Sequence, residues 1–289
     1  MEAEVVDGVR RFARLVTQCF GALDDRYLSL DRPLGQARVL WEIGCDGREV
    51  GALRLRLGLD SAQLSRTLRA LEADGLVTVR PDGRDARVRV AELTRRGVAE
   101  WRELDNRSVA AVADLLDRLD PVRRDRFAQA AAELERLLLA SSIEVTQRPP
   151  THAAARAALR AYADELTRRF QLDVNPAIGS DLTPPDGVLL VATLHGEPVG
   201  CGGLRFHAGK PPEIKRLWAA PSVRGCGLGR RLLAELEQLA RGCGARSVRL
   251  DTHRTLTEAI ALYRSAGYRE IAAYNDNPHA HHWFSKRLR

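Results

Sequence analysis

The first half of the chain repeats its apolar residues at helical spacing. Between residues 4 and 28 the apolar positions fall three or four apart, which predicts an amphipathic helix. Residues 76–80 and 87–91 instead have strand-like patterns around a Pro-Asp-Gly turn, so a β-hairpin interrupts the helices. Further helices are predicted at residues 37–42, 50–57, 61–73 and, with a break at Pro121, from 94 to about 139.

The second half alternates between strand and helix patterns, which is typical of an α/β domain with a mixed central sheet. Its predicted strands are residues 188–194, 199–206, 213–219 and 247–251, with one or two more near the C-terminus. Its predicted helices are residues 153–171, 228–241 and 257–265. A polar stretch from Ser141 to Pro150 is predicted to be a linker, which gives two domains at residues 1–145 and 150–289.

The charge is distributed unevenly between these halves. The 289 residues carry a net charge of +7, of which −1 falls in residues 1–145 and +8 in residues 146–289. Residues 50–96 nevertheless hold 10 arginines against 6 acidic residues, so a basic segment lies inside the acidic half. Such basic regions suit either nucleic acid or a polyanionic cofactor.

The composition also indicates a reducing compartment. Five scattered cysteines without a C-x-x-C pair disfavour a disulfide framework and a zinc site. The N-terminus is acidic and unlike a signal peptide, and no apolar run reaches the ~20 residues that span a bilayer. We therefore expect a cytoplasmic protein that has no membrane partner and binds no metal.

The predicted helix at residues 61–73 and the hairpin after it have the residues of a DNA reader. Leu64, Leu68 and Leu71 are expected to face inward. Short polar and basic side chains on the opposite face suit base edges and phosphates in a major groove, and arginines at the hairpin tip suit a minor groove. The predicted DNA-binding residues are Ser61, Gln63, Ser65, Arg66, Arg69, Arg84 and Arg87.

Over roughly residues 5–142 the chain resembles the MarR family of winged-helix regulators. The resemblance rests on Pro33-Leu-Gly-Gln-Ala-Arg-Val-Leu40, on residues 64–77, and on Asp85-x-Arg87 followed by Leu93-Thr-Arg-Arg-Gly97. It implies a homodimer, built from the first and last helices, that binds a pseudo-palindromic operator in double-stranded DNA. The usual wing has two arginines after the aspartate, and here Ala86 takes the first place, where Arg84 is expected to compensate. The alternative is a winged helix that serves only as a dimer scaffold.

A glycine-rich turn, Arg224-Gly-Cys-Gly-Leu-Gly229, lies between a predicted strand and a predicted helix. Glycines allow successive backbone N–H groups to face one anion, and the positive end of the following helix dipole adds to that field. No Lys-Ser/Thr pair follows the last glycine, so the turn is not a P-loop. It predicts a phosphate-binding site of another kind.

Together with Ala259-Ile-Ala-Leu-Tyr-Arg-Ser-Ala-Gly-Tyr268, this turn resembles the GNAT superfamily of acetyl-CoA-dependent N-acetyltransferases, over about residues 152–289. The resemblance implies that the turn amides cradle the CoA pyrophosphate and that the preceding strand bonds the pantetheine arm through its backbone. A bulge in that strand would offer an N–H to the thioester carbonyl. The cofactor-binding residues implied are Leu217, Trp218, Ala219, Arg224, Gly225, Cys226, Gly227, Leu228, Gly229 and Arg230.

Acetyl transfer needs two proton movements. An ammonium must lose a proton before it attacks, and the leaving thiolate is better expelled when it is protonated. The resemblance places Tyr263 as the acid. Glu213 and Asp251 are both candidates for the base, with Glu213 slightly preferred, unless Glu213 only pairs with a neighbouring cation of its strand.

The family's Asn seven residues before the Tyr is replaced here by Leu256, and Thr252 or Thr257 are candidates to supply the lost contact. His279, His281 and His282 are expected to line the acceptor pocket or pack at its edge.

The predicted protein is a transcriptional regulator coupled to an N-acetyltransferase that acts on a primary amine, either a small molecule or an amino-acid-like compound. The excess of arginine near the site favours an acceptor that bears a carboxylate. The rival hypothesis is a non-catalytic sensor of acetyl-CoA or another metabolite that controls DNA binding.

Overall fold

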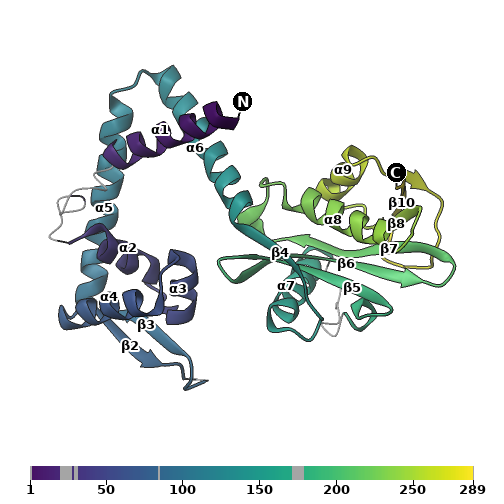
Figure 1. The fold of residues 1–289 in the computed structure, drawn as a ribbon, viewed down its shortest axis with the longest axis horizontal. Coiled ribbons are helices and arrows are strands. Elements are labelled where there is room, and N and C mark those ends of the chain that lie inside the picture. The colour runs from purple at the N-terminus through teal and green to yellow at the C-terminus, as the bar shows by residue number, and fades with distance from the viewer. Residues whose placement is uncertain (1, 20–27, 29–31, 84, 171–178, 289) are drawn as a thin grey trace. The chain divides into compact units, whose positions relative to one another are not determined.

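The computed structural model describes residues 2–19, 28, 32–83, 85–170 and 179–288. The chain forms two compact units, an N-terminal unit of Met1–Ala130 and a C-terminal unit of Ala131–Arg289. The first is mainly helical and the second contains a large mixed sheet (Figure 1). This is the fold class that the sequence predicts.

The N-terminal unit packs short helices against a small antiparallel sheet of strand order β1-β3-β2. Leu40, Leu53, Leu64 and Leu76 are fully buried in its core. The β2–β3 hairpin extends away from the helices as a wing (Figure 1). The elements are α1 (Glu2–Cys19), α2 (Leu34–Ile43), β1 (Arg48–Glu49), α3 (Val50–Leu57), α4 (Ser61–Ala73), β2 (Val77–Pro81), β3 (Arg89–Leu93), α5 (Arg95–Asp117) and the beginning of α6 (Pro121–Ser142).

Two local features position α4 and the wing. The Asp60 carboxylate accepts the N–H of Gln63 at 2.7 Å and so caps α4. At the base of the wing, a Cβ on Gly97 would lie 2.0 Å from the carbonyl oxygen of Leu76. Helix α5 can therefore begin against the hairpin only because residue 97 is a glycine.

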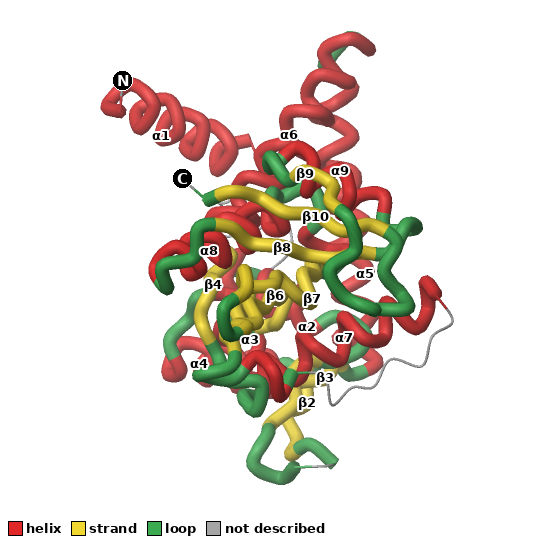
Figure 2. Tube along the Cα trace, turned by 90° about the vertical axis from the view of Figure 1, so that its right-hand side faces the viewer, coloured by secondary structure: helices red, strands yellow, loops and turns green. Residues whose placement is uncertain are grey.

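The C-terminal unit is built on a seven-stranded sheet of order β4-β5-β6-β7-β8-β10-β9. Only β7 and β8 pair in parallel, and the other neighbours pair antiparallel. Figure 2 shows β8, β10 and β9 next to one another at one end of this sheet. The strands are β4 (Ile143–Gln147), β5 (Gly187–Leu194), β6 (Glu197–His207), β7 (Lys210–Ala219), β8 (Ser247–Thr252), β9 (Arg269–Ile271) and β10 (His282–Arg287).

Helices cover both faces of the sheet. α7 (Ala153–Phe170) lies on one face, and α8 (Leu228–Gly242) and α9 (Thr257–Ser265) lie on the other (Figure 1). Residues Leu232 and Leu236 of α8 are fully buried in one core cluster, and Ala155 and Ala158 of α7 are fully buried in another. The sequence predicts the bounds of α9 as the structure has them.

The stretch predicted to be a linker is instead part of the sheet. Ile143–Gln147 forms β4 and pairs antiparallel with β5 over its whole length. Ile143 is buried and Val145 packs against the same cluster, while Glu144 between them is exposed, which is the period-two pattern of an edge strand. Polar neighbours hide this pattern in the sequence. The compact units consequently divide within α6, after Ala130, and not at residues 145–150.

At the N-terminus, residues 20–27 of the predicted first helix lie outside the described residues. No helix among the described residues has both the length and the apolar composition required to cross a membrane.

Candidate functional site

A cleft of about 900 Å³ opens in the C-terminal unit beside the second half of β7. The parallel strands β7 and β8 are in register at Glu213 and Arg249, and the cleft lies where β7 continues past this pair. Residues 214–219 of β7 form one wall, and α7, the glycine-rich turn and α9 form the others. The cleft therefore joins the segments that the sequence assigns to cofactor binding and catalysis.

Strand β7 bulges inside this cleft. Its pairing with β6 shifts between Cys201↔Trp218 and Gly203↔Lys215, so that two residues of β7 oppose one of β6. Arg216, within the bulge, has a φ of 54°, in the left-handed region that non-glycine residues seldom occupy. The expected bulge is present, and Leu217–Ala219 line the cleft.

The glycine-rich turn leads directly into the first turn of α8. Gly225 and Gly227 have φ values of 83° and 78°, which residues with side chains rarely adopt. The N–H groups of Leu228–Arg230 belong to the first turn of the helix and have no acceptor within it. The N–H of Cys226, in contrast, already has an acceptor, because it donates to the carbonyl of Val223 at 3.3 Å. Cys226 also does not border the cleft.

Glu165 of α7 joins the turn to β7. Its carboxylate accepts hydrogen bonds from Trp218 Nε1 at 2.8 Å and from Arg224 Nη2 at 2.6 Å, and pairs with Arg169 at 2.9 Å. Burial raises the pKa of Glu165, but these bonds and the two arginine charges outweigh burial and lower it. Sequence reasoning missed this residue, because it lies more than 50 positions before Trp218 and Arg224.

Tyr263 of α9 borders the cleft and is only 6% exposed. Its ring packs 5.9 Å from those of Tyr268 and Phe284, measured between centroids. Burial, and then the neighbouring Tyr162 and Asp251, raise the pKa of its phenol. Tyr162 of α7 is a second phenol in the cleft, and burial raises its pKa to about 12. Both phenols are therefore protonated at neutral pH.

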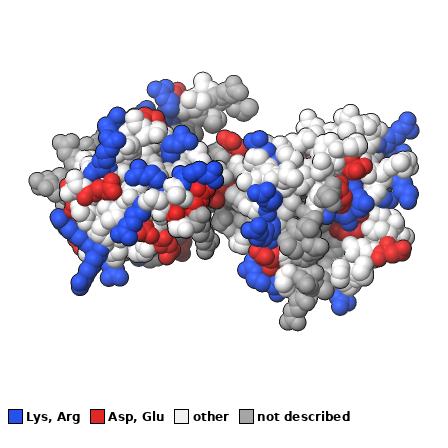
Figure 3. Space-filling model, turned by 90° about the horizontal axis from the view of Figure 1, so that it is seen from below, with Lys and Arg blue, Asp and Glu red and all other residues white. Residues whose placement is uncertain are grey.

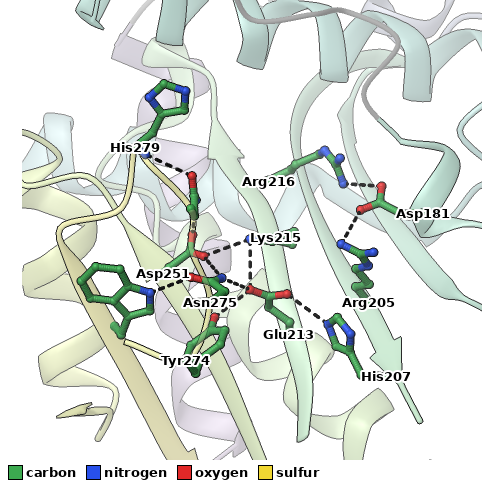
Figure 4. A network of polar contacts seen from close by, with 12 residues as sticks. Asp181, Arg205, His207, Glu213, Lys215, Arg216, Asp251, Tyr274, Asn275 and His279 are labelled. Atoms are coloured by element: carbon green, nitrogen blue, oxygen red, sulfur yellow. Dashed lines mark hydrogen bonds and ion pairs between the residues drawn. The ribbon is translucent and has the colours of Figure 1, made fainter. Parts of the chain in front are cut away.

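Glu213 is buried in a polar network behind the cleft (Figure 4). Its Oε1 accepts hydrogen bonds from Tyr274 at 2.7 Å and from Lys215 Nζ at 3.0 Å, and its Oε2 lies 3.1 Å from His207 Nε2. Burial raises the pKa of Glu213, but the Lys215 charge and the bonds from these three groups outweigh burial and lower it. Glu213 does not border the cleft, and the pairing with Lys215 considered from the sequence is present.

Asp251 lies at the other side of this network and does border the cleft. Its Oδ2 is 3.1 Å from Lys215 Nζ and accepts a hydrogen bond from Asn275 Nδ2 at 2.7 Å, and its Oδ1 accepts one from Asn277 Nδ2 at 3.2 Å. Figure 4 shows Lys215 between the two carboxylates. Of the two residues predicted as bases, Asp251 is the one placed against the cleft.

Two histidines and Leu256, which stands in place of the family's Asn, also border the cleft. His253 and His279 border it, whereas His282 bonds Glu270 at 2.6 Å outside it. Leu256 borders the cleft itself, as Thr252 does. Within the described ranges, no group of three or more His, Cys, Asp or Glu side chains is arranged to hold a metal ion.

In the N-terminal unit, α4 and the wing present the residues predicted to contact DNA. Arg87 is exposed, and its Nε and Nη2 each lie 3.0 Å from the Asp85 carboxylate, while Arg84 lies outside the described residues. Figure 3 shows basic side chains spread over the face of this unit seen from below, with acidic ones between them. On α4, Ser65 is partly buried and the exposed residues are Ser61, Gln63, Arg66 and Arg69.

Two family models match the chain, one in each unit. Residues 151–268 match the Acetyltransferase (GNAT) family, and residues 29–88 match the MarR family. The first match runs from α7 past the end of α9 and includes every residue lining the cleft except Asn277 and His279. The second covers α2 to α4 and β2, and ends just before β3.

Two curated proteins are similar to about a third of the chain. An uncharacterized N-acetyltransferase of Schizosaccharomyces pombe is 39% identical over 97 residues, which are 33% of this chain and 60% of that protein. The IAA acetyltransferase of Azospirillum brasilense is 40% identical over 88 residues, 30% of this chain and 58% of that protein. The chain thus spans about 60% of the length of these curated relatives.

A solved structure from Klebsiella pneumoniae, assigned as an acyl-CoA N-acyltransferase, is 31% identical and has a TM-score of 0.42. The similarity covers 50% of this chain and 97% of that one. The C-terminal unit thus has a segment of the GNAT acetyltransferase family, and a segment of the MarR family precedes it in the same polypeptide.

Proposed function

We propose that the C-terminal unit transfers the acetyl group of acetyl-CoA to a primary amine, and that the N-terminal unit binds double-stranded DNA as a homodimer. The proposal for the C-terminal unit rests above all on the cleft, where the amide-rich turn, the bulged strand, Tyr263 and Asp251 come together. The protein is then a transcriptional regulator that carries its own acetyltransferase.

The cleft fits acetyl-CoA, which supplies an activated acetyl group as a thioester. The N–H groups of Leu228–Arg230 at the start of α8 suit the pyrophosphate, with Arg224, Gly225 and Gly227 completing the turn. Leu217–Ala219 run along the wall and offer backbone groups to the pantetheine arm. The N–H of Cys226 is already bonded within the turn, so we leave that residue out of the phosphate contacts.

Asp251 and Tyr263 are the residues that we assign to proton transfer. A nitrogen–carbon bond forms while the carbon–sulfur bond breaks, and from ammonium to amide the nitrogen loses two protons while the sulfur gains one. Asp251 accepts the first proton from the ammonium at the cleft wall, and Tyr263, kept protonated by burial, donates to the sulfur. The second proton of the nitrogen returns to the phenolate of Tyr263, which restores the acid. Glu213 acts as a positioning residue, because it holds Lys215 against Asp251.

Two cations that border the cleft, Lys215 and Arg216, already have carboxylate partners. Lys215 lies between two carboxylates, and Arg216 Nη1 is 2.9 Å from Asp181. An acceptor carboxylate would compete with these carboxylates for the two cations. We therefore favour a small primary amine over an acceptor recognised through a carboxylate.

Acetyl transfer is tested by incubating the full chain with acetyl-CoA and a panel of polyamines, arylalkylamines and amino acids. Free thiol release and the mass of the product are measured. Acetylation of at least one amine well above the rate without enzyme supports the proposal. Tight acetyl-CoA binding with no acetylation across the panel would instead support the sensor hypothesis.

Arg66→Ala should weaken binding to an operator selected from genomic fragments by about tenfold, because an arginine on the exposed face of α4 is placed for base or phosphate contacts. Fluorescence anisotropy at fixed salt measures this change. Arg118→Ala removes an exposed arginine outside α4 and the wing and is the matched control. Equal affinities for both variants and the wild-type protein would contradict the placement of α4 in a groove.

Phe12→Asp should convert the homodimer into a monomer. The helix α1 leaves apolar side chains exposed along one stripe, including Val5, Val9, Phe12 and Leu15, a pattern that marks an interaction surface. Gln18→Asp places the same charge on the polar side of α1 and should leave the dimer intact. Light scattering after size-exclusion chromatography distinguishes the two, and a wild-type monomer would remove this part of the proposal.

A further inference from the structure

Helix α6 spans the boundary between the two compact units. It begins at Pro121 and ends at Ser142, so its first ten residues belong to the N-terminal unit and the rest to the C-terminal unit. β4 follows without a break, and Arg231 of α8 donates from Nη1 to the carbonyl of Ile143 at 2.8 Å. The end of α6 is therefore tied to the first turn of α8.

Arg136 lies on this last part of α6, beside the glycine-rich turn. A Cβ built on Gly225 would lie 3.5 Å from Arg136 Cδ, which is ordinary van der Waals contact. The Arg136 side chain is 45% exposed, and its Nε and Nη2 bond the Glu133 carboxylate at 3.0 and 2.6 Å. The stem of the arginine thus packs against the turn that is proposed to hold phosphate.

Three arginines in the glycine-rich turn and the first turn of α8 also have partners. Arg224 is held by Glu165, Arg230 donates to Ser265 Oγ at 2.7 Å, and Arg231 pairs with Glu235 at 2.9 Å. The partner of Arg136 is an exposed carboxylate three residues earlier on the same helix. An exposed pair of this kind stabilises the helix only weakly, so a phosphate can replace the carboxylate as the partner of Arg136.

We propose that Arg136 binds a phosphate group of CoA and exchanges its bond to Glu133 for that contact. This inference rests on the proposed function of the cleft. It makes a helix that begins in the N-terminal unit part of the cofactor site. In the bound state Arg136 then connects the C-terminal end of α6 directly to the cofactor. The glycine-rich turn by itself makes no such connection.

Calorimetric titration of the full chain with CoA tests the proposal. Arg136→Gln should raise the Kd by roughly tenfold, because a charge-assisted bond to phosphate is lost. Arg126→Gln, an exposed arginine ten residues earlier on the same helix, should leave the Kd unchanged. Glu133→Gln should lower the Kd, because it frees Arg136 without removing it, and a folding defect would not tighten binding.

Dephospho-CoA, which lacks the 3′-phosphate, shows which phosphate is bound. If Arg136→Gln weakens only CoA, the contact is to the 3′-phosphate, and if it weakens both ligands, the contact is to the pyrophosphate. Equal CoA affinity for Arg136→Gln and wild type would overturn the inference while leaving the proposed function intact. No CoA binding by the wild-type chain would overturn the proposed function, and this inference with it.

Discussion

Tyr263→Phe should lower kcat by about 100-fold while the Kd for acetyl-CoA changes by less than about twofold. The substitution removes one hydroxyl from a ring that packs against Tyr268 and Phe284, so the packing of the ring is retained. Burial raises the pKa of this phenol and keeps it protonated at the cleft wall. Without the hydroxyl, the sulfur must leave as a thiolate.

Steady-state kinetics with saturating amine measure kcat, and calorimetry measures acetyl-CoA binding. Tyr162→Phe is the matched control, because it removes the other buried phenol of the same cleft. We expect Tyr162→Phe to keep most of the activity. If Tyr162→Phe lost more activity than Tyr263→Phe, the acid would be on α7 and the assignment to α9 would be wrong.

The elements around the cleft are predictable because their sequence patterns are local. Leu228, Leu232, Leu236 and Ala240 recur at helical spacing and are all buried on one side of α8. Gly225 and Gly227 need a positive φ, so glycines at these positions indicate a turn before the fold is known. These two patterns locate the glycine-rich turn without information from distant residues.

β4 and the network behind the cleft have no such local pattern. β4 follows α6 directly and has polar residues at its outward positions, so its few apolar residues look like part of a linker. Tyr274, Asn275 and Asn277 lie in the segment between β9 and β10 and meet Glu213 and Asp251 only once the sheet is assembled. Their contacts depend on strand order, which spacing along the sequence does not determine.

This network also changes which carboxylate is the better candidate for the base. The sequence slightly favours Glu213, because it lies on the strand that lines the site. In the structure Glu213 is surrounded by donors, its pKa is lowered, and it does not border the cleft. Asp251 belongs to the same network, but unlike Glu213 it borders the cleft.

Asp251→Asn should therefore lower kcat/KM by about 100-fold or more near neutral pH, the usual cost of losing a general base. Because the free amine needs no base, the loss should shrink as the pH approaches the pKa of the amine. Glu213→Gln tests the positioning role: it should cost less than about tenfold at neutral pH, with the pH dependence of the wild-type protein retained. A pH–rate profile of each variant separates the roles. Greater loss in Glu213→Gln than in Asp251→Asn, with the pH dependence abolished, would assign the base to Glu213 acting through water.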